Sequence, residues 1–485
     1  MLVPLNNFAP DVDPTTPGVI VDCSNLLPTL KGWRAAPTPV SLGMPALAST
    51  CRGLTVARKL DGTWRVFAGT GTALLEAVGS SWVDQSRVGG YSNPAEARWR
   101  FCQFGNITLA ANRTDALQQS LGTTFADVAT APKAAIIETV AGFVMAFDVV
   151  DTAGTGFGDQ PDGWWCSALR NQADWTPAIA TQSANGRLLD TPGAIRAGRR
   201  LGGDIVAYKE RSMYLGRYVG PPIIWAWTLI PGEIGALSHE AVVDIGTAHV
   251  FLGPDDFYLF DGTRPASIGA SLREWFFARL DPSYQYKVQS LHDRKNAVVY
   301  WFYPVVGSGG TLTEWVAFHY KANKWGRGAL SIEAASEYLN GAITYDNLGS
   351  RFATYDDLPA IAYDSPYWTA ASALQSVVNA SHVLQALNGP AADASLTTDE
   401  LGDDRSFTTL TEVRPRFLKS PTTATLTHQV HDTLGDALTE PESSDLNAGK
   451  FDALWSARWH RLKVSTTGDM EITALRAEFT EDGTQ

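Results

Sequence analysis

The sequence predicts an all-β protein: a β-propeller of about six degenerate four-stranded blades, with an additional antiparallel β-domain built from the chain ends. Counting the repeats gives six blades, and five or seven also fit. Three observations predict this fold: internal repeats of about 40–50 residues, short β-branched or aromatic runs bounded by turn residues, and two-residue alternation near the C-terminus. We therefore predict an extended N-terminal arm at 1–45, the propeller at 46–360 and a C-terminal antiparallel β-domain at 361–485.

The first segment is rich in proline and has few periodic apolar runs. Proline fixes its backbone φ angle and has no N–H group to donate to a β-ladder. An extended arm is therefore expected at 1–45, and its prolines are Pro4, Pro10, Pro14, Pro17, Pro28, Pro37 and Pro39.

The middle of the chain repeats itself. "GNITLAANRTDAL" (105–117) and "GDIVAYKERSMYL" (203–215) share Gly, Ile, Arg and Leu in step, and "TALLEAVGSSWVD" (72–84) matches "DALQQSLGTTFAD" (115–127) in the same way. A single blade buries neither face, so several blades must pack in a ring. We interpret the first pair as equivalent hairpins two blades apart. Successive units are closed by the aromatic residues Trp82, Phe125, Trp175, Trp227 and Trp325.

The pattern changes after about residue 360. Polar and apolar residues alternate at 394–418, 423–432 and 451–480, which is typical of an antiparallel sheet with one solvated face. The stretch "ALQSVVNASHVLQAL" (373–387) fits either a helix or two strands joined by a turn.

Composition narrows the function classes. The 485 residues carry a formal net charge of −13, which disfavours a protein that grips nucleic acid by its phosphates. The four cysteines show no metal-site spacing, which favours buried thiols in a reducing compartment. No apolar run reaches the length of a membrane span and no secretory signal opens the sequence, so a soluble, non-secreted protein is expected.

We find no constellation typical of an active site, a cofactor site or a metal site, and we predict that the protein is not an enzyme. His428 and His431 are three apart in a predicted strand, so they are expected on opposite faces. "LDGTW" (60–64) lacks the leading Ser and the spacing of the sialidase Asp-box. The basic pair Arg199 and Arg200 is expected in a link that faces solvent or a neighbouring subunit.

Two glycine-rich segments are candidate loops. "GTGFGDQPDGWW" (154–165) is either a mobile loop above core tryptophans or a projection that binds a partner through Trp164 and Trp165. Glycine-rich tips can bend into a channel and retract. The candidate channel or gate residues are Gly154, Gly156, Gly307, Gly309 and Gly310.

Several stretches together resemble one known family. They are "NNFAPDVDPTTPGVIVDCSNLLPTLKGWRAAP" at the start, "ATAPKA" (129–134), "WWCSALRNQADWTP", "TEVRPRF" and "ARWHRLKVSTTGD" at the end. This chain resembles the nozzle, or tail-tube, proteins of short-tailed bacteriophages. The strand with the pattern R-W-H-R-L is the most specific part, and its candidate subunit or partner contacts are Arg458, Trp459, His460 and Arg461.

The resemblance implies a structural virion protein of the tail, made in the cytoplasm of the bacterial host. Six copies would form a homohexameric ring below the portal and adaptor, in contact with tail fibres or spikes. Genomic DNA would pass through the ring without specific binding, and no catalytic residue or cofactor comes with the family. Two other interpretations stay open: a propeller-type polysaccharide hydrolase or lyase, and a monomeric propeller binding module.

Overall fold

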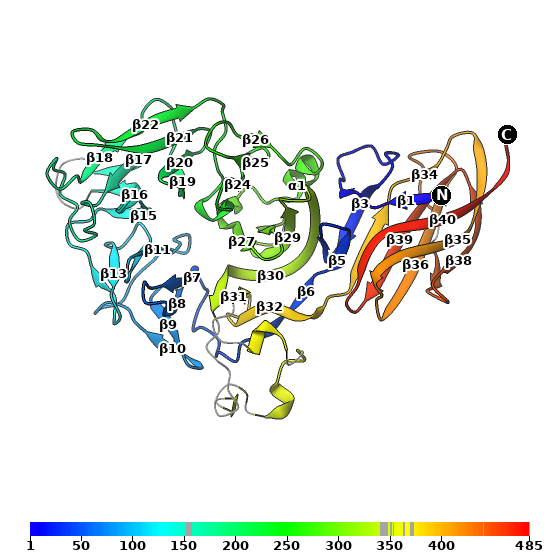
Figure 1. Ribbon diagram of the computed structural model, residues 1–485, viewed down its shortest axis with the longest axis horizontal. Helices are drawn as coiled ribbons and strands as arrows, with labels where there is room; N and C mark the ends of the chain where they lie inside the picture. The colour runs from blue at the N-terminus through cyan, green and yellow to red at the C-terminus, as the bar shows by residue number, and fades with distance from the viewer. Residues whose placement is uncertain are drawn as a thin grey trace.

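The computed structural model describes residues 1–484 except 152–157, 340–347, 350, 351, 353, 362, 363, 369–372 and 440. Strands dominate these residues, and they form a ring of blades beside a two-sheet domain (Figure 1). The helical elements are short: α1 (Arg273–Arg279), η1 (His239–Ala241), η2 (Gln285–Lys287), η3 (Tyr355–Asp357) and η4 (Pro366–Trp368).

Six consecutive blades follow one another between Gly53 and Leu339. Blade 1 contains β7 (Gly53–Arg58), β8 (Trp64–Gly69), β9 (Leu74–Val78) and β10 (Ser81–Asp84). Blade 2 contains β11 (Arg100–Phe104), β12 (Ile107–Ala111), β13 (Gln118–Ser120) and β14 (Ala126–Asp127). Blade 3 contains β15 (Lys133–Val140), β16 (Phe143–Val150), β17 (Asp159–Cys166) and β18 (Ala184–Arg187). Blade 4 contains β19 (Ile195–Leu201), β20 (Asp204–Lys209), β21 (Met213–Gly220) and β22 (Ile224–Ile230). Blade 5 contains β23 (Val242–Asp244), β24 (His249–Leu252), β25 (Phe257–Phe260) and β26 (Ala266–Ser267). Blade 6 contains β27 (Gln289–Asp293), β28 (Val298–Pro304), β29 (Leu312–His319) and β30 (Lys324–Leu339).

A seventh blade closes the ring. The second half of β30 leaves the sixth blade and pairs with β31 (Ala373–Asn379), which pairs with β32 (Leu384–Ala391), which pairs with β6 (Pro37–Ser41). β30 also contacts both β27 and β7, and Ala334 and Tyr338 in its second half share an apolar cluster with Val66 of the first blade. The seventh blade therefore lies between the sixth and the first. The stretch 373–387 is therefore two strands joined by a turn.

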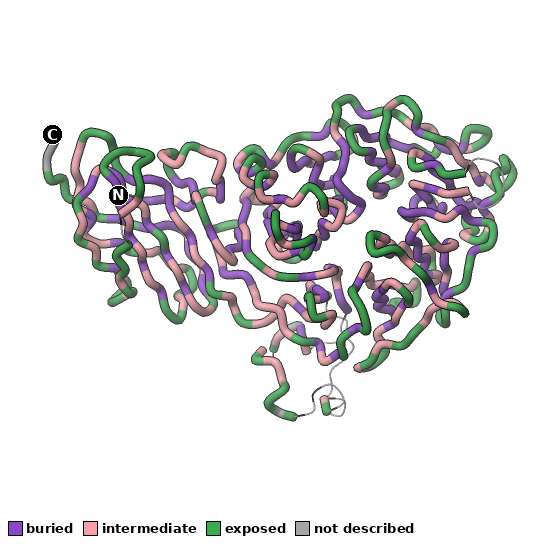
Figure 2. Tube along the Cα trace, turned by 180° about the vertical axis from the view of Figure 1, so that it is seen from behind, coloured by how far each residue is buried: buried purple, intermediate pink, exposed green. Residues whose placement is uncertain are grey.

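The burial pattern explains why the second strand of each blade is so apolar. β20 and β24 are buried along almost their whole length, whereas the outermost strands β14 and β26 are exposed. Figure 2 shows exposed segments mainly along the outer rim of the blades. A second strand packs against a neighbouring blade on both of its faces, so both faces need apolar side chains. Strands such as β14 and β26 face solvent, which accounts for the change from apolar runs to polar turns within their repeats.

An apolar cluster fills each space between neighbouring blades. Adjacent side chains of one strand point to opposite faces, so one strand contributes to two clusters. Around the ring, from the first interface to the last, representative members are Phe67 with Phe125, Leu109 with Trp165, Trp164 with Trp225, Tyr208 with Phe251, Val250 with Trp301, Tyr300 with Val377, and Val378 with Val66.

The two chain ends form a β-sandwich. One sheet has the order β2-β3-β33-β39-β36-β37 with β34 on β39, and the other has β4-β5-β40-β35-β38 with β1 on β40. The strands are β1 (Leu2–Pro4), β2 (Asn7–Phe8), β3 (Val19–Ser24), β4 (Leu26–Pro28), β5 (Trp33–Ala35), β33 (Ala394–Thr398), β34 (Leu401–Gly402), β35 (Ser406–Lys419), β36 (Thr423–His431), β37 (Glu442–Asp445), β38 (Phe451–Ala457), β39 (Trp459–Thr467) and β40 (Glu471–Thr484).

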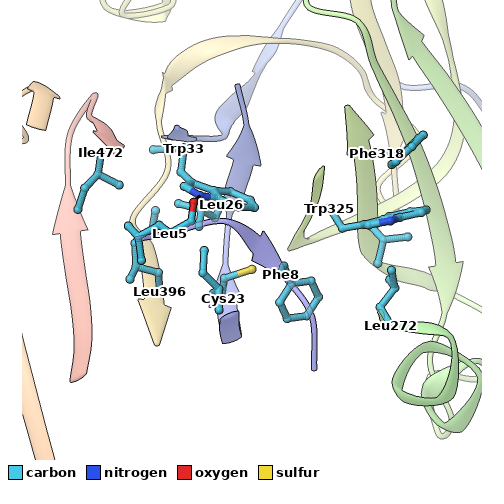
Figure 3. Packing of buried hydrophobic residues seen from close by; sticks show 14 of the residues in the cluster. Leu5, Phe8, Cys23, Leu26, Trp33, Leu272, Phe318, Trp325, Leu396 and Ile472 are labelled. Carbon is cyan, nitrogen blue, oxygen red and sulfur yellow. Dashed lines mark hydrogen bonds between the residues drawn. The ribbon is translucent and has the colours of Figure 1, made fainter. Parts of the chain in front are cut away.

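The sandwich and the propeller share one apolar core. Phe8, Leu26 and Trp33 of the N-terminal strands lie between the sandwich residue Ile472 and the propeller residue Trp325 (Figure 3). Polar contacts cross the same junction, since Asn7 Oδ1 accepts a hydrogen bond of 2.8 Å from the Trp325 backbone amide. The N-terminal segment thus connects the two parts of the molecule.

The predicted fold class is confirmed: the protein is all-β, with a propeller of four-stranded blades and an antiparallel domain built from the chain ends. The number of blades is seven, one more than the count of about six. The additional blade was not counted because its strands come from three separate stretches of the chain. Strands β1 to β6 lie in the segment expected as an extended arm, and β31 and β32 lie in the segment expected as the C-terminal domain.

Candidate functional site: the central cavity

The innermost strands of the seven blades surround a cavity of about 460 Å³. β7, β11, β15, β19, β23, β27 and the second half of β30 all contribute lining residues, so the cavity lies on the axis of the ring. Concave sites of this size, with a few polar groups, are where small molecules bind most often. It is the strongest candidate site in the part of the chain that the structure describes.

Arg100 and Glu240 form the tightest ion pair of the cavity. Arg100 Nε and Nη2 donate to the two carboxylate oxygens of Glu240 at 2.7 and 3.0 Å, and Arg100 Nη1 donates to the carbonyl oxygen of Ala135 at 3.0 Å. Burial alone would raise the pKa of Glu240, but the Arg100 guanidinium outweighs it and holds that pKa below its ordinary value. The pair joins blade 2 to the segment that enters blade 5.

Arg199 and Glu138 are held less closely. Arg199 Nη1 lies 3.7 Å from Glu138 Oε2, and the Arg199 Nε atom is buried without a hydrogen-bond partner among the described residues. Burial raises the pKa of Glu138 above its ordinary value, and the Arg199 charge only partly opposes this. The neighbouring Arg200 also lines the cavity, and the described residues provide no ion-pair partner for it.

A second cavity of about 630 Å³ adjoins the first, with Thr55, Gln103, Arg294, Ser336 and Glu337 lining both. Arg58 and Lys295 line only the second cavity. The Glu337 carboxylate lies between two arginines, 3.6 Å from Arg58 Nη2 and 3.7 Å from Arg294 Nε.

The two histidines of the cavity are neutral near pH 7. Burial, with a contribution from Arg199, holds the pKa of His239 well below its ordinary value, and burial together with Arg294 lowers the pKa of His292 to about 4. Among the described residues, no group of three or more His, Cys, Asp or Glu side chains is placed to hold a metal ion.

Trp164 and Trp165 are buried core residues, as one of the two interpretations expected, and the alternative that they bind a partner is wrong. Their exposures are 6% and 2%. They are consecutive in β17, so Trp164 packs between blades 3 and 4 while Trp165 packs between blades 2 and 3. The Trp165 indole also donates to the Trp175 carbonyl oxygen at 2.9 Å.

Of the four candidate contacts at 458–461, Trp459 and His460 of β39 are buried within the chain itself. His460 is fully buried and lies 2.9 Å from His428, and the Trp459 indole donates to Asp404 Oδ1 at 3.1 Å. Because both side chains are buried within the sandwich, Trp459 and His460 are not a contact surface. Arg458 and Arg461 are half-buried: Arg458 lies over the Phe407 ring, and Arg461 binds the Glu400 carboxylate.

The loop between β28 and β29 does not line the central cavity. Gly307, Gly309 and Gly310 have positive φ angles of 87°, 63° and 82°. This loop packs beside the C-terminal end of α1, where the Val306 amide donates to the Arg279 carbonyl oxygen. Its role at a channel between subunits stays a prediction. Gly154 and Gly156 lie outside the described residues.

The ionic lining of the cavity was not predicted. Arg199 and Arg200 lie in the inner strand β19 and line the cavity, whereas the sequence suggested a link facing solvent or another subunit. A pattern that could have located the lining is a charged residue in the first apolar run of a repeat. Examples are "RWRF" (98–101), "IIETV" (136–140), "AGRRL" (197–201) and "VVDIG" (242–246). Polar residues there mark the strands that face the axis.

Comparison with known proteins yields fold-level likenesses only. No protein-family profile and no curated protein match the chain. PorZ of Porphyromonas gingivalis, an essential bacterial surface component of the type-IX secretion system, is 8% identical, with 85% of this chain and 46% of PorZ covered and a TM-score of 0.37. This chain therefore spans about half the length of PorZ.

Two further solved structures are similar at the same low level. YCF48 from Cyanidioschyzon merolae is 13% identical, with 73% of this chain and 99% of that chain covered and a TM-score of 0.36. AztD from Citrobacter koseri is 10% identical, with 56% and 85% covered and a TM-score of 0.30. Similarity at these TM-scores carries no argument about function. Separately, no helix within the described residues is long and apolar enough to cross a membrane.

Proposed function

We propose that this protein is the tail nozzle of a short-tailed bacteriophage, a structural ring through which genomic DNA leaves the virion. The main support for the proposal is the position in the fold of three stretches that resemble the nozzle family. The N-terminal stretch 6–37, "TEVRPRF" in β35 and "ARWHRLKVSTTGD" in β39 are far apart in sequence, and all three belong largely to the sandwich. They act as one structural unit beside the propeller.

Two of the four cavity carboxylates are held by arginines, which disfavours a role for these two in glycoside hydrolysis. Glycosidases need two carboxyl groups across the substrate, one as acid and one free as base or nucleophile. Glu240 is held by both of its oxygens on Arg100, and Glu337 lies between two arginines. Glu138 has the raised pKa of a general acid. Asp244 lines the same cavity without an ion-pair partner among the described residues, and its Oδ1 accepts a hydrogen bond of 2.7 Å from the Gly246 amide in its own turn.

The net charge fits a channel that lets DNA slide. Each copy carries a formal charge of −13, and a ring of six copies multiplies it. An acidic lumen repels phosphates and lowers the friction of a passing duplex. Mapping of the channel-lining residues in an assembled ring tests this point, and a lumen dominated by Arg and Lys would contradict it.

The decisive experiment measures assembly. The purified chain of 52.4 kDa is studied by size-exclusion chromatography with light scattering, alone and co-expressed with the proteins encoded by adjoining genes. Electron microscopy of the resulting particles should show sixfold rings with an open centre. A chain that stays monomeric in every mixture would overturn the proposal and favour a monomeric binding module. Release of reducing sugar from bacterial polysaccharide would favour the hydrolase instead.

A further inference from the structure

The axial cavity and the cavity that adjoins it carry an excess of positive charge in an acidic protein. Seven cationic side chains face four carboxylates there, whereas the whole chain has a net charge of −13. The cations are Arg52, Arg58, Arg100, Arg199, Arg200, Arg294 and Lys295, and the carboxylates are Glu138, Glu240, Asp244 and Glu337.

The arginines of the cavity differ in how many hydrogen-bond and ion-pair partners they have within the chain. Arg100 is saturated by Glu240 and the Ala135 carbonyl, and Arg52 donates to the carbonyl oxygens of Asn93 and Pro94 at 3.0 and 2.7 Å. Arg199 is different, because its one acidic neighbour lies 3.7 Å away and its Nε is buried without a partner in the described structure.

Arg200, the next residue of β19, adds a second guanidinium near the same carboxylate, since its charge also acts to lower the pKa of Glu138. It lines the same cavity from β19 and is exposed, and no described residue forms an ion pair with it. Its backbone carbonyl accepts a hydrogen bond from His249 Nε2 at 2.8 Å, which fixes the strand at this point. A buried donor without a partner is costly, and a ligand oxygen would satisfy it.

We propose that the axial cavity binds a small oxyanion, a carboxylate or phosphate group, through Arg199 and Arg200. The planar guanidinium fork matches both anions in geometry and charge. A volume of about 460 Å³ accommodates a small molecule and excludes a nucleic acid duplex, so the ligand is a metabolite-sized anion or an acidic group of a larger saccharide. This site is independent of the nozzle assembly, and neither proposal requires the other.

The test measures binding of two probes to the full chain by isothermal titration calorimetry, with inorganic phosphate in one arm and malonate in the other. Both arms contain 150 mM sodium chloride, which screens non-specific attraction to a basic surface. Binding of phosphate alone or of malonate alone assigns the anion class, and binding of both supports the shared chemistry. No binding of either probe at millimolar concentration overturns the proposal.

Variants connect binding to the two arginines. R199K keeps the charge opposite Glu138 but removes the fork, and R200Q removes the second guanidinium; each should weaken binding about tenfold, as expected for one charge-assisted hydrogen bond. R196Q is the matched control, because Arg196 lies on the same strand but pairs with Glu210 on the exposed surface. Equal affinity in all variants, with unchanged circular dichroism and thermal midpoint, overturns the assignment to Arg199 and Arg200.

Discussion

At the scale of single residues, the Arg100–Glu240 pair connects two blades that are not neighbours. Because both groups are largely buried, removing one of them leaves the other charge without a partner. We expect E240A to destabilise the propeller by about 3 kcal/mol. Thermal unfolding of E240A, of an Arg100→Met variant and of the double variant measures this, and the double variant should recover part of the loss. Full additivity of the two single effects would contradict the pairing.

The same pair predicts how stability responds to acid. The pKa of Glu240 in the folded chain is held below its ordinary value of 4.5. Its contribution is therefore present above that pH and is lost as the pH falls through the folded pKa.

A buried histidine pair in the sandwich gives a second pH dependence, at a milder pH. His428 Nε2 and His460 Nδ1 lie 2.9 Å apart, and burial lowers the pKa of both imidazoles to about 4 from 6.5. Between these values the unfolded chain binds protons that the folded chain excludes. Stability is therefore complete above pH 6.5 and decreases towards pH 4, by roughly 1.4 kcal/mol per pH unit for each imidazole.

The measurement is the thermal midpoint between pH 4 and 7. The double variant H428Q/H460Q should show a flatter dependence on pH than the native chain, while K463Q, an exposed change in the same strand β39, should leave the slope unchanged. An unchanged slope in the double variant would show that this pair does not govern the acid response.

At the scale of elements, the repeats located the blades correctly. The stretches 105–117 and 203–215 contain β12 and β20, the second strands of blades 2 and 4, so they are equivalent positions two blades apart. The repeat could be recognised in the sequence because the second strand of each blade is apolar on both faces. The seventh blade was not readable, since β6 and β31–β32 are separated in sequence by the whole ring and show no shared repeat.

The candidate site was harder to predict than the blades because its residues, like the strands of the seventh blade, are far apart in the sequence. Arg100 and Glu240 lie 140 residues apart, and only closure of the ring brings their side chains together. A one-dimensional pattern marks Arg199 and Arg200 as charged but does not show that β19 faces the axis. Burial of Trp164 and Trp165 also depends on the neighbouring blades.

Strand β6 closes the ring, and a cross-link tests its register. Ser41 is the Cα partner of Gln385, and the neighbouring Leu42 amide donates to the Leu384 carbonyl oxygen, so the Ser41–Gln385 pair is the non-hydrogen-bonded type that suits a disulfide. The variant S41C/Q385C should oxidise and raise the thermal midpoint, because the bond closes a very long loop worth up to about 4 kcal/mol.

The native thiols should not compete in this oxidation. Burial raises the pKa of Cys23, Cys51, Cys102 and Cys166 to about 12, so they carry almost no thiolate near pH 8. Non-reducing electrophoresis and mass spectrometry detect the bond, with each single-cysteine variant as control. Failure to form an intramolecular disulfide would contradict the pairing of β6 with β32.

At the scale of the whole molecule, the propeller and the sandwich depend on each other through the N-terminal segment. β4 pairs with β30 and with β5, β5 pairs with β40, and Trp33 is fully buried in the core that both parts share. An interface of this kind, apolar and continuous, couples the unfolding of two bodies more strongly than a flexible linker does. We therefore expect the intact chain to unfold in one cooperative transition.

Two fragments separate closure of the ring from support by the sandwich. Residues 46–360 lack β6, β31 and β32, so blade 1 would expose the face that carries Val66 and Ala68. This fragment should aggregate or remain loosely packed, with weak near-ultraviolet circular dichroism from its tryptophans. Residues 37–391 contain all seven blades and should unfold cooperatively, at a lower temperature than the intact chain because Trp325 and Phe318 lose their contacts with the sandwich. A well-folded 46–360 fragment, with a sharp transition equal to that of 37–391, would show that six blades close without the seventh.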